Sequence, residues 1–180
     1  GAIFTPISSI SEAIRKQTIT INGVSKTFSM TGWRIGFAVG DPDIIAAMAK
    51  IISQTTSNPT TVAQYAAIEA LTGDQAPIED MRQAFENRLN TIYPLLAEIP
   101  GFEVIKPEGA FYLFPNVKKA MEMKGYTDVT AFTTAILEEA GVALVTGAGF
   151  GAPENLRLSY ATDLDTLKEA VRRIKAFMEN

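Results

Sequence analysis

Cysteine and histidine are both absent from this chain of 180 residues. Without cysteine the chain can form neither a disulfide framework nor a thiolate nucleophile. The two absences together exclude histidine-dependent triads and zinc sites built from histidine and cysteine. Lysine is the best remaining candidate for a nucleophile and proton carrier. A chain without cysteine also fits a cytosolic protein, and we therefore predict a cytoplasmic location.

The sequence also lacks a strong excess of charge and a long apolar run. Its formal charge is −4, from 16 basic and 20 acidic side chains, so no clustered basic face predicts a nucleic-acid partner. No apolar run reaches membrane-spanning length, and we expect no membrane contact. The chain begins at Gly1 without a signal-peptide pattern, and its opening residues indicate that further sequence precedes them.

One stretch concentrates the chemistry that remains, residues 25–36, which hold Lys26 and, eight positions later, Arg34. Small and apolar neighbours predict that the Lys26 amine is desolvated, which favours its neutral, nucleophilic form. Such an amine forms Schiff bases with carbonyl compounds, including pyridoxal phosphate. From the pattern alone, an ordinary cation beside a turn is the commoner case for a lone lysine.

The stretch extends beyond one lysine. Residues 22–26 (Asn-Gly-Val-Ser-Lys) and 30–36 (Met-Thr-Gly-Trp-Arg-Ile-Gly) resemble the cofactor-lysine segment of class I aminotransferases. These are pyridoxal-phosphate enzymes with the aspartate aminotransferase fold, known as fold type I. The resemblance implies that Lys26 is the catalytic residue that binds pyridoxal 5'-phosphate covalently, and that Arg34 pairs with the cofactor phosphate. Ser25 either donates to that phosphate or only completes the turn.

The resemblance covers essentially the whole chain and implies an α/β fold with an α+β small domain, the C-terminal part of a fold-type-I transferase. Residues 1–76 would end the large cofactor-binding α/β domain, and residues 77–180 would form a bridging helix and the small domain. The two strands of the first part are too few for a buried parallel sheet, so we expect exposed apolar surface on them.

Periodicity and turn signals predict the elements. Strands are predicted at residues 17–22, 34–40, 102–106, 110–114, 142–145 and 156–160. Helices are predicted at residues 11–16, 41–54, 58–71, 77–99 and 129–140, and from residue 162 or 163 to the end. Asp128 is predicted to cap the helix at residues 129–140 and Gly141 to stop it. Thr162 or Asp163 should cap the last helix, whose predicted buried stripe is Leu164, Leu167, Val171, Ile174 and Phe177. Asn58 is predicted to cap the third helix and Gly73 to end it in a left-handed conformation, while residues 107–109 should close a hairpin.

Arg157 is the only charged residue in residues 156–161. The pattern alone favours a side chain pointing to solvent from an edge strand over one entering a site. The segment, however, resembles the strand that carries the substrate-carboxylate arginine in class I aminotransferases, because a guanidinium binds a carboxylate through a planar fork. Residues 57–60 and 109–112 resemble segments near a neighbouring subunit's cofactor and near the substrate entrance. For both, helix capping or core packing is an equal alternative.

Two departures from the family pattern limit the prediction. The family's upstream half, with the aspartate that pairs with the cofactor's ring nitrogen, is not in this chain. Residues 53–56 (Ser-Gln-Thr-Thr) stand where one branch carries an arginine for a distal carboxylate, which puts recognition of dicarboxylic substrates in doubt.

We therefore predict part of a pyridoxal-phosphate-dependent aminotransferase that moves an amine between an amino acid, best guess aspartate, and a 2-oxo acid. The complete enzyme is expected to be a homodimer, and this chain alone is expected to be inactive. A β-lyase or decarboxylase on the same fold stays open, as does a non-catalytic binding or dimerisation module.

Overall fold

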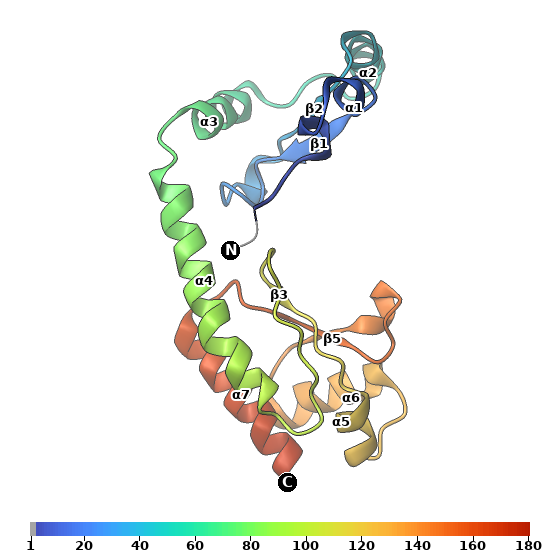
Figure 1. The fold of residues 1–180 in the computed structure, drawn as a ribbon, viewed down its shortest axis with the longest axis vertical. Helices are drawn as coiled ribbons and strands as arrows, with labels where there is room; N and C mark the ends of the chain where they lie inside the picture. The colour runs from blue at the N-terminus through green and yellow to red at the C-terminus, as the bar shows by residue number, and fades with distance from the viewer. Residues whose placement is uncertain (1–2) are drawn as a thin grey trace. The chain divides into compact units, whose positions relative to one another are not determined.

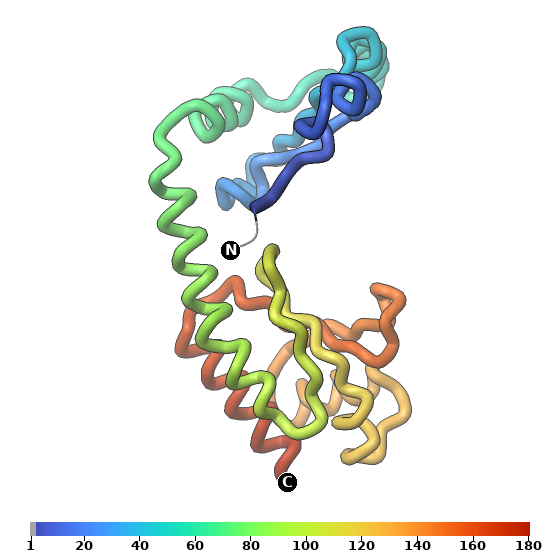
Figure 2. The backbone as a smooth tube through the Cα atoms, viewed as in Figure 1, coloured from blue at the N-terminus to red at the C-terminus, as the bar shows by residue number. Residues whose placement is uncertain are grey.

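The computed structural model describes residues 3–180 and divides the chain into two compact units, Gly1–Asp80 and Met81–Asn180. The division falls inside one long helix, α4 (Ala76–Ala97), and the domain boundary predicted after residue 76 lies at the start of the same helix. Figures 1 and 2 trace this helix without a break from one unit into the other. Each unit has its own hydrophobic core, and each is described separately below.

The first unit contains one antiparallel pair of strands, β1 (Thr20–Gly23) and β2 (Gly36–Val39), with Thr20 opposite Val39 and Gly23 opposite Gly36. Both strands are shorter than predicted. In particular, the second strand does not begin at Arg34, because the backbone of that residue is left-handed, with φ 55° and ψ 44°. A residue in that region of φ/ψ space cannot take part in a β-ladder.

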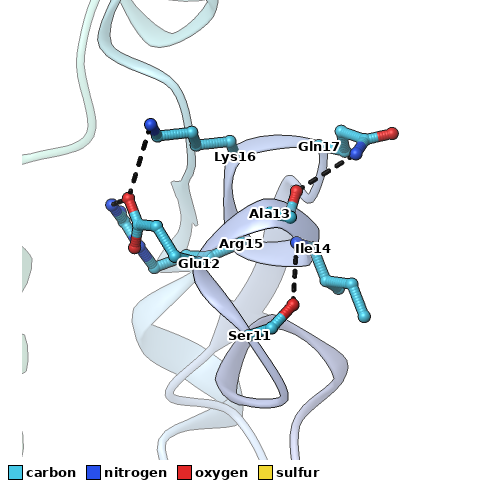
Figure 3. A network of polar contacts seen from close by, with 7 residues as sticks. All are labelled: Ser11, Glu12, Ala13, Ile14, Arg15, Lys16 and Gln17. Carbon is cyan, nitrogen blue, oxygen red and sulfur yellow. Dashed lines mark hydrogen bonds and ion pairs between the residues drawn. The ribbon is translucent and has the colours of Figure 1, made fainter.

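Short helical segments flank the pair, among them the turns η1 (Ile7–Ser9) and η2 (Thr31–Trp33). The predicted helical turn at residues 11–16 is α1 (Glu12–Lys16), capped by Ser11, whose hydroxyl accepts from the Ile14 N–H at 3.3 Å. Figure 3 shows how Glu12 binds two cations one turn away, Arg15 at 2.7 Å and Lys16 at 3.8 Å. Exposed pairs of this kind add little stability, so α1 is held mainly by its cap and its neighbours.

Two longer helices follow, α2 (Pro42–Thr55) and α3 (Thr61–Thr72). Asp41 caps α2, accepting from the Asp43 N–H at 3.0 Å. The predicted capping of α3 is wrong at both ends: the N-cap is Thr60, and Gly73 leaves the helix with φ −79°. The Asn58 amide instead donates to the Pro59 carbonyl at 2.8 Å, so its side chain is turned to a local bond before the helix begins.

The second unit holds a three-stranded antiparallel sheet in the order β3 (Tyr112–Leu113), β5 (Leu156–Ser159) and β4 (Val145–Thr146). The predicted strand at residues 102–106, and with it the predicted hairpin, is wrong. Glu103 makes a single bridge to Asn116, exchanging two backbone hydrogen bonds of 2.9 Å. The chain then leaves the ladder toward Pro107, which has no N–H to donate to a strand partner.

Helices cover this sheet (Figure 1). The predicted helix at residues 129–140 is α6 (Val129–Ala135), which widens into the π-helical turn η3 (Ile136–Ala140), and Gly141 ends it with φ 66° as predicted. The helix α5 (Lys118–Met123) was not predicted from the sequence, since it has only two turns and no side-chain cap. The turn η4 (Gly147–Phe150) and the final helix α7 (Leu164–Glu179) complete the unit.

The core of the second unit is large and continuous. It joins α4, the sheet, α5, α6 and α7 through fully buried side chains that include Ile92, Leu96, Leu113, Phe132, Leu156 and Ile174. The predicted apolar stripe of α7 is confirmed, with Leu167, Val171, Ile174 and Phe177 buried. Its predicted cap is confirmed too, since the Asp163 carboxylate accepts from the Thr166 N–H at 2.8 Å.

The hydrophobic core of the first unit has far fewer buried side chains than that of the second. Its core cluster contains only Val24, Ile35, Ala63 and Ala67 as buried members. The expected exposed apolar surface on the strands is confirmed, since Ile21 is 77% and Val39 is 62% exposed. Within residues 3–180, no helix is both long and apolar enough to cross a bilayer.

Candidate functional site

Lys26, Ser25 and Arg34 all lie in one twelve-residue loop, residues 24–35, that joins β1 to β2. The Val24 N–H donates to the Ile35 carbonyl at 3.3 Å and closes the loop at its base. Inside it, the Phe28 N–H donates to the Val24 carbonyl at 3.3 Å and the Ser29 N–H to the Lys26 carbonyl at 3.2 Å. The loop is therefore a compact folded turn, in which position 26 is fixed from both sides.

Helix α3 packs against the base of this loop. Val24 is fully buried and packs with Ile35 against Ala63 and Ala67, while Phe28 and Met30 cover the edge of the cluster. Alanine has no side chain beyond Cβ, so the helix can approach the loop backbone closely. The base of the loop is thus held by packing as well as by hydrogen bonds.

Lys26 itself is exposed, which corrects the expectation of a desolvated amine. The apolar neighbours in the sequence do not surround it, because Val24 turns toward α3 while Lys26 and Thr27 face outward. The sequence shows that the loop is rich in small and apolar residues. It could not predict which members of the loop face inward.

Arg34 occupies the left-handed backbone region, an uncommon conformation for a residue with a side chain, at a typical cost of about 1–3 kcal/mol. Its Nη1 donates to the Thr31 carbonyl at 2.8 Å, which ties the guanidinium to η2. Within the described part of the chain, Arg34 forms no ion pair with a carboxylate. Its exposed side chain therefore keeps donors for an anion.

Ser25 is half-buried beside Lys26. Across residues 3–180 its hydroxyl has no hydrogen-bond partner. Two cations and one hydroxyl on a single loop form a donor set of the kind that fits a phosphorylated aldehyde, with an amine to react and a guanidinium to pair with phosphate.

Arg157 lies in the second unit, on β5, which is the central strand of its sheet. The prediction of an exposed edge position is therefore wrong. Its Cζ lies over two aromatic rings, 4.4 Å from the Tyr112 centroid and 4.7 Å from the Phe150 centroid. Both distances are inside the range of cation–π attraction, so the guanidinium is half-buried between side chains of β3 and η4.

The two faces of β5 have different surroundings. Leu156, Leu158 and Tyr160 are buried in the core, while Arg157 and Ser159 lie between them in the alternation of the strand. Among residues 3–180, Arg157 forms no ion pair, and no carboxylate neutralises it. A half-buried guanidinium without a carboxylate is a ready site for an external one.

Two residues that hold this region in place, Tyr160 and Phe150, were not identified from the sequence. The Tyr160 hydroxyl donates to the Ala110 carbonyl at 2.9 Å, and Ala110 has φ 61°, so the turn before β3 is fixed to the core. Phe150 reaches Arg157 from the glycine-rich turn η4, where it also contacts the Phe114 ring edge-on at 6.1 Å. In the sequence, the only indication of a role for Phe150 is its position between two glycines of this loop.

The two segments whose role was left open, residues 57–60 and 109–112, are also placed, together with residues 53–56, which precede the first of them. Residues 53–56 are exposed and lie at the C-terminal end of α2 and just beyond it. Ser57 follows with φ 61°, and its N–H donates to the Ile52 carbonyl at 2.9 Å. Gly109 and Ala110 form the exposed turn before β3, whereas the Phe111 ring packs against Phe85 at 5.9 Å.

A hollow of about 600 Å³ lies elsewhere in the second unit, between residues 141–144 and the first half of α7. None of the four predicted site residues lines it. Two of its charged lining residues pair with each other, Glu169 and Arg173 at 2.8 Å, and hydrogen bonds from Arg172 and Arg173 lower the pKa of Glu169 to about 2. Within residues 3–180, no cluster of acidic side chains could hold a metal ion.

The chain is similar to aminotransferases over nearly its whole length. It is 79% identical over 179 residues to asparagine--oxo-acid transaminase of Streptococcus mutans and 60% identical to aspartate aminotransferase of Bacillus subtilis. Each comparison covers 99% of this chain and 46% of the relative, so the chain spans about half the length of these relatives.

Solved structures agree on the α/β fold. The aspartate aminotransferase of Rhizobium meliloti has a TM-score of 0.90 at 36% identity, covering 99% of this chain and 46% of that one. The aromatic aminotransferase of Pyrococcus horikoshii has a TM-score of 0.89 at 36% identity, with 99% and 47% covered. The prediction that these residues form the C-terminal half stays a prediction. Residues 2–174 match the family model for class I and II aminotransferases, and the chain belongs to that family.

Proposed function

We propose that the protein to which this chain belongs transfers an amino group between an amino acid and a 2-oxo acid, with pyridoxal 5'-phosphate as cofactor. The observation that carries the proposal is the loop of residues 24–35, which holds an exposed amine and a guanidinium on one packed support. Family membership and the printed names of the relatives support the same reaction.

The donor set of the loop supports the following roles within the first unit. Lys26 would hold the cofactor through its amine, and Arg34 would pair with the cofactor phosphate, with Ser25 as a further donor. The cofactor, when bound, supplies an electron sink that stabilises negative charge on the α-carbon of the substrate. The Lys26 amine, released when substrate binds, would carry the proton to and from that carbon.

Arg157 would bind the α-carboxylate of the substrate. The guanidinium rests on two rings that cannot accept its in-plane N–H bonds, so these donors stay available for a planar, two-bond fork. Removing one partner of a desolvated charge pair typically costs about 2–5 kcal/mol. In the complete protein, Arg157→Ala is therefore expected to lower kcat/KM for amino acids far more than for the matching amines.

The amino donor is proposed to be aspartate or asparagine. Aspartate is the best guess from the family. The most similar of the relatives described above carries asparagine in its name, and residues 53–56 offer no arginine for a distal carboxylate. A donor with an uncharged side-chain amide does not require that arginine.

The test uses a family-length protein that contains these residues. Purified protein with bound cofactor is supplied with 2-oxoglutarate and with either aspartate or asparagine, and formation of glutamate is measured. Glutamate from either donor supports the proposal. Ammonia or pyruvate without glutamate would replace it with a lyase. The 180-residue chain alone, as a control, is expected to give no turnover.

The complete protein is proposed to act as a homodimer, as the family prediction has it. Sedimentation of the family-length protein measures its mass directly. A monomer that keeps full activity would remove this part of the proposal and leave the reaction untouched.

A further inference from the structure

We propose that Asn22 is a site of spontaneous deamidation, at which the backbone nitrogen of Gly23 displaces the side-chain amide. The site is separate from the proposed cofactor residues. It stands at the end of β1, two residues before the loop of residues 24–35 begins.

The sequence makes Asn22 unlike every other asparagine in the chain. It alone precedes glycine, which has no side chain to block an approach of its nitrogen. The others precede Pro59, Arg88, Thr91, Val117 and Leu156, or end the chain at Asn180. Asn58 provides an internal control, because the proline after it has no N–H to lose.

The strand register leaves the Gly23 nitrogen out of the ladder. The Val24 N–H donates to the Ile35 carbonyl, which makes positions 24 and 35 a bonded pair. In an antiparallel ladder bonded and non-bonded pairs alternate, so the pair of Gly23 and Gly36 is non-bonded. The Gly23 N–H therefore points away from β2. Within the described residues β1 has no second strand partner on that side.

The side chain of Asn22 takes the place of a ladder partner for this N–H. Its Oδ1 accepts from the Gly23 N–H at 2.7 Å, and the side chain is exposed to water. This bond holds the nitrogen next to the amide carbon, Cγ, to which Oδ1 is attached. The two reacting groups are thus already adjacent in the folded chain, which replaces a search through many conformations.

The reaction balances without any oxidant or metal. The Gly23 nitrogen forms a bond to Cγ of Asn22 and gives up its proton, while the side-chain amide leaves as ammonia. The five-membered imide that results is opened by one water molecule at either carbonyl. The products are aspartate, or isoaspartate in which the main chain runs through Cβ and Cγ.

Both products change the entrance to the loop. Each adds one negative charge four positions before Lys26. Isoaspartate also lengthens the main chain between Asn22 and Gly23 by one carbon, so the pairs of Asn22 with Phe37 and Gly23 with Gly36 can no longer both stay in register. The site would therefore act as a slow chemical timer beside the proposed cofactor loop.

The test is incubation of the native 180-residue chain in mildly alkaline buffer, with samples digested and mapped by mass spectrometry. A mass gain of about 1 Da marks the exchange of an amide for a carboxyl group. We expect the gain at Asn22 to appear at least about tenfold faster than at exposed Asn90 in the same sample, because of the adjacent reacting groups. Asn58 should stay unchanged.

A matched variant, Asn22→Gln, separates the geometry from general instability. Its side chain is one carbon longer and cannot close a five-membered ring, so position 22 should stay intact while Asn90 behaves as in the parent chain. Circular dichroism establishes that both proteins are folded during incubation. Loss of ammonia at Asn22 no faster than at Asn90, or much faster only after denaturation in urea, would overturn the proposal.

Discussion

The Cζ atom of Arg157 lies over the ring of Tyr112, 4.4 Å from its centroid. The two residues come from neighbouring strands, since Tyr112 pairs with Ser159 across β3 and β5. The ring compensates part of the hydration that the half-buried guanidinium loses, without using any of its hydrogen-bond donors.

This relationship predicts a measurable coupling. In urea unfolding of the chain, Tyr112→Leu and Arg157→Met should show a double-mutant coupling energy of about 0.5–2 kcal/mol. Tyr112→Phe keeps the ring and should retain most of the coupling, since the attraction comes from the ring face. A coupling near zero for Tyr112→Leu would mean that the ring only lies beside the cation.

Lys26 is predicted to be the residue that reacts with pyridoxal phosphate. The chain is mixed with the aldehyde, reduced with borohydride and digested, and the labelled peptide is sequenced. The label should fall on Lys26 and should be lost in Lys26→Ala. Lys50, exposed on α2 in the same unit, serves as a control for random reaction. A label spread evenly over exposed lysines would contradict the assignment.

We predict that the N-terminal end of α7, which Asp163 caps, is destabilised by acid. The hydrogen bonds of Asp163 to Thr166 lower the pKa of the carboxyl from its ordinary value of 3.8. A carboxyl group with a lowered folded pKa stabilises the fold above its unfolded pKa and loses that contribution as the pH falls through the folded pKa. Stability should therefore fall below about pH 4 more steeply in the parent than in Asp163→Asn, which still caps but cannot titrate. The free energy of unfolding is measured by denaturant titration at each pH. If it fell equally with pH in both proteins, the charge of Asp163 would have no role.

Phe132 tests the separation of the two cores. It is fully buried in the second unit and contacts Tyr126 and Phe177 through ring distances of 5.6 and 6.0 Å. Phe132→Ala should cost about 3–5 kcal/mol in the unfolding of that unit. Hydrogen exchange should show the loss in α6 and α7 but not in β1 and β2. A uniform loss in both units would indicate one cooperative core.

Much of the second unit could be predicted from the sequence because its signals are local. The stripe of α7, the caps Asp128 and Asp163, and the stop at Gly141 all follow from neighbouring residues. The strand predicted at residues 102–106 is wrong because pairing of this segment depends on Asn116, ten or more positions away, and not on its own alternation of polar and apolar residues.

The residues of the candidate site were chosen by resemblance, and their surroundings could not be predicted from the sequence. Resemblance selected Lys26, Arg34 and Arg157, and the structure brings the first two into one loop. The exposure of Lys26, the left-handed backbone of Arg34 and the rings around Arg157 are tertiary features. Ala63 and Ala67 lie 29 or more positions after Arg34, and Phe150 reaches Arg157 from a turn that begins ten positions before it, so no local periodicity places these side chains beside the site residues.

The alternation of β5 limits how this protein can change in length. Because adjacent residues face opposite sides, adding or deleting one residue within the strand would exchange the two sets. The guanidinium would turn into the core, and Leu156 or Leu158 would turn toward the aromatic rings. No gradual route leads between these arrangements. Evolution along this strand is therefore expected to proceed by substitution, with insertions confined to turns such as the one before Tyr112.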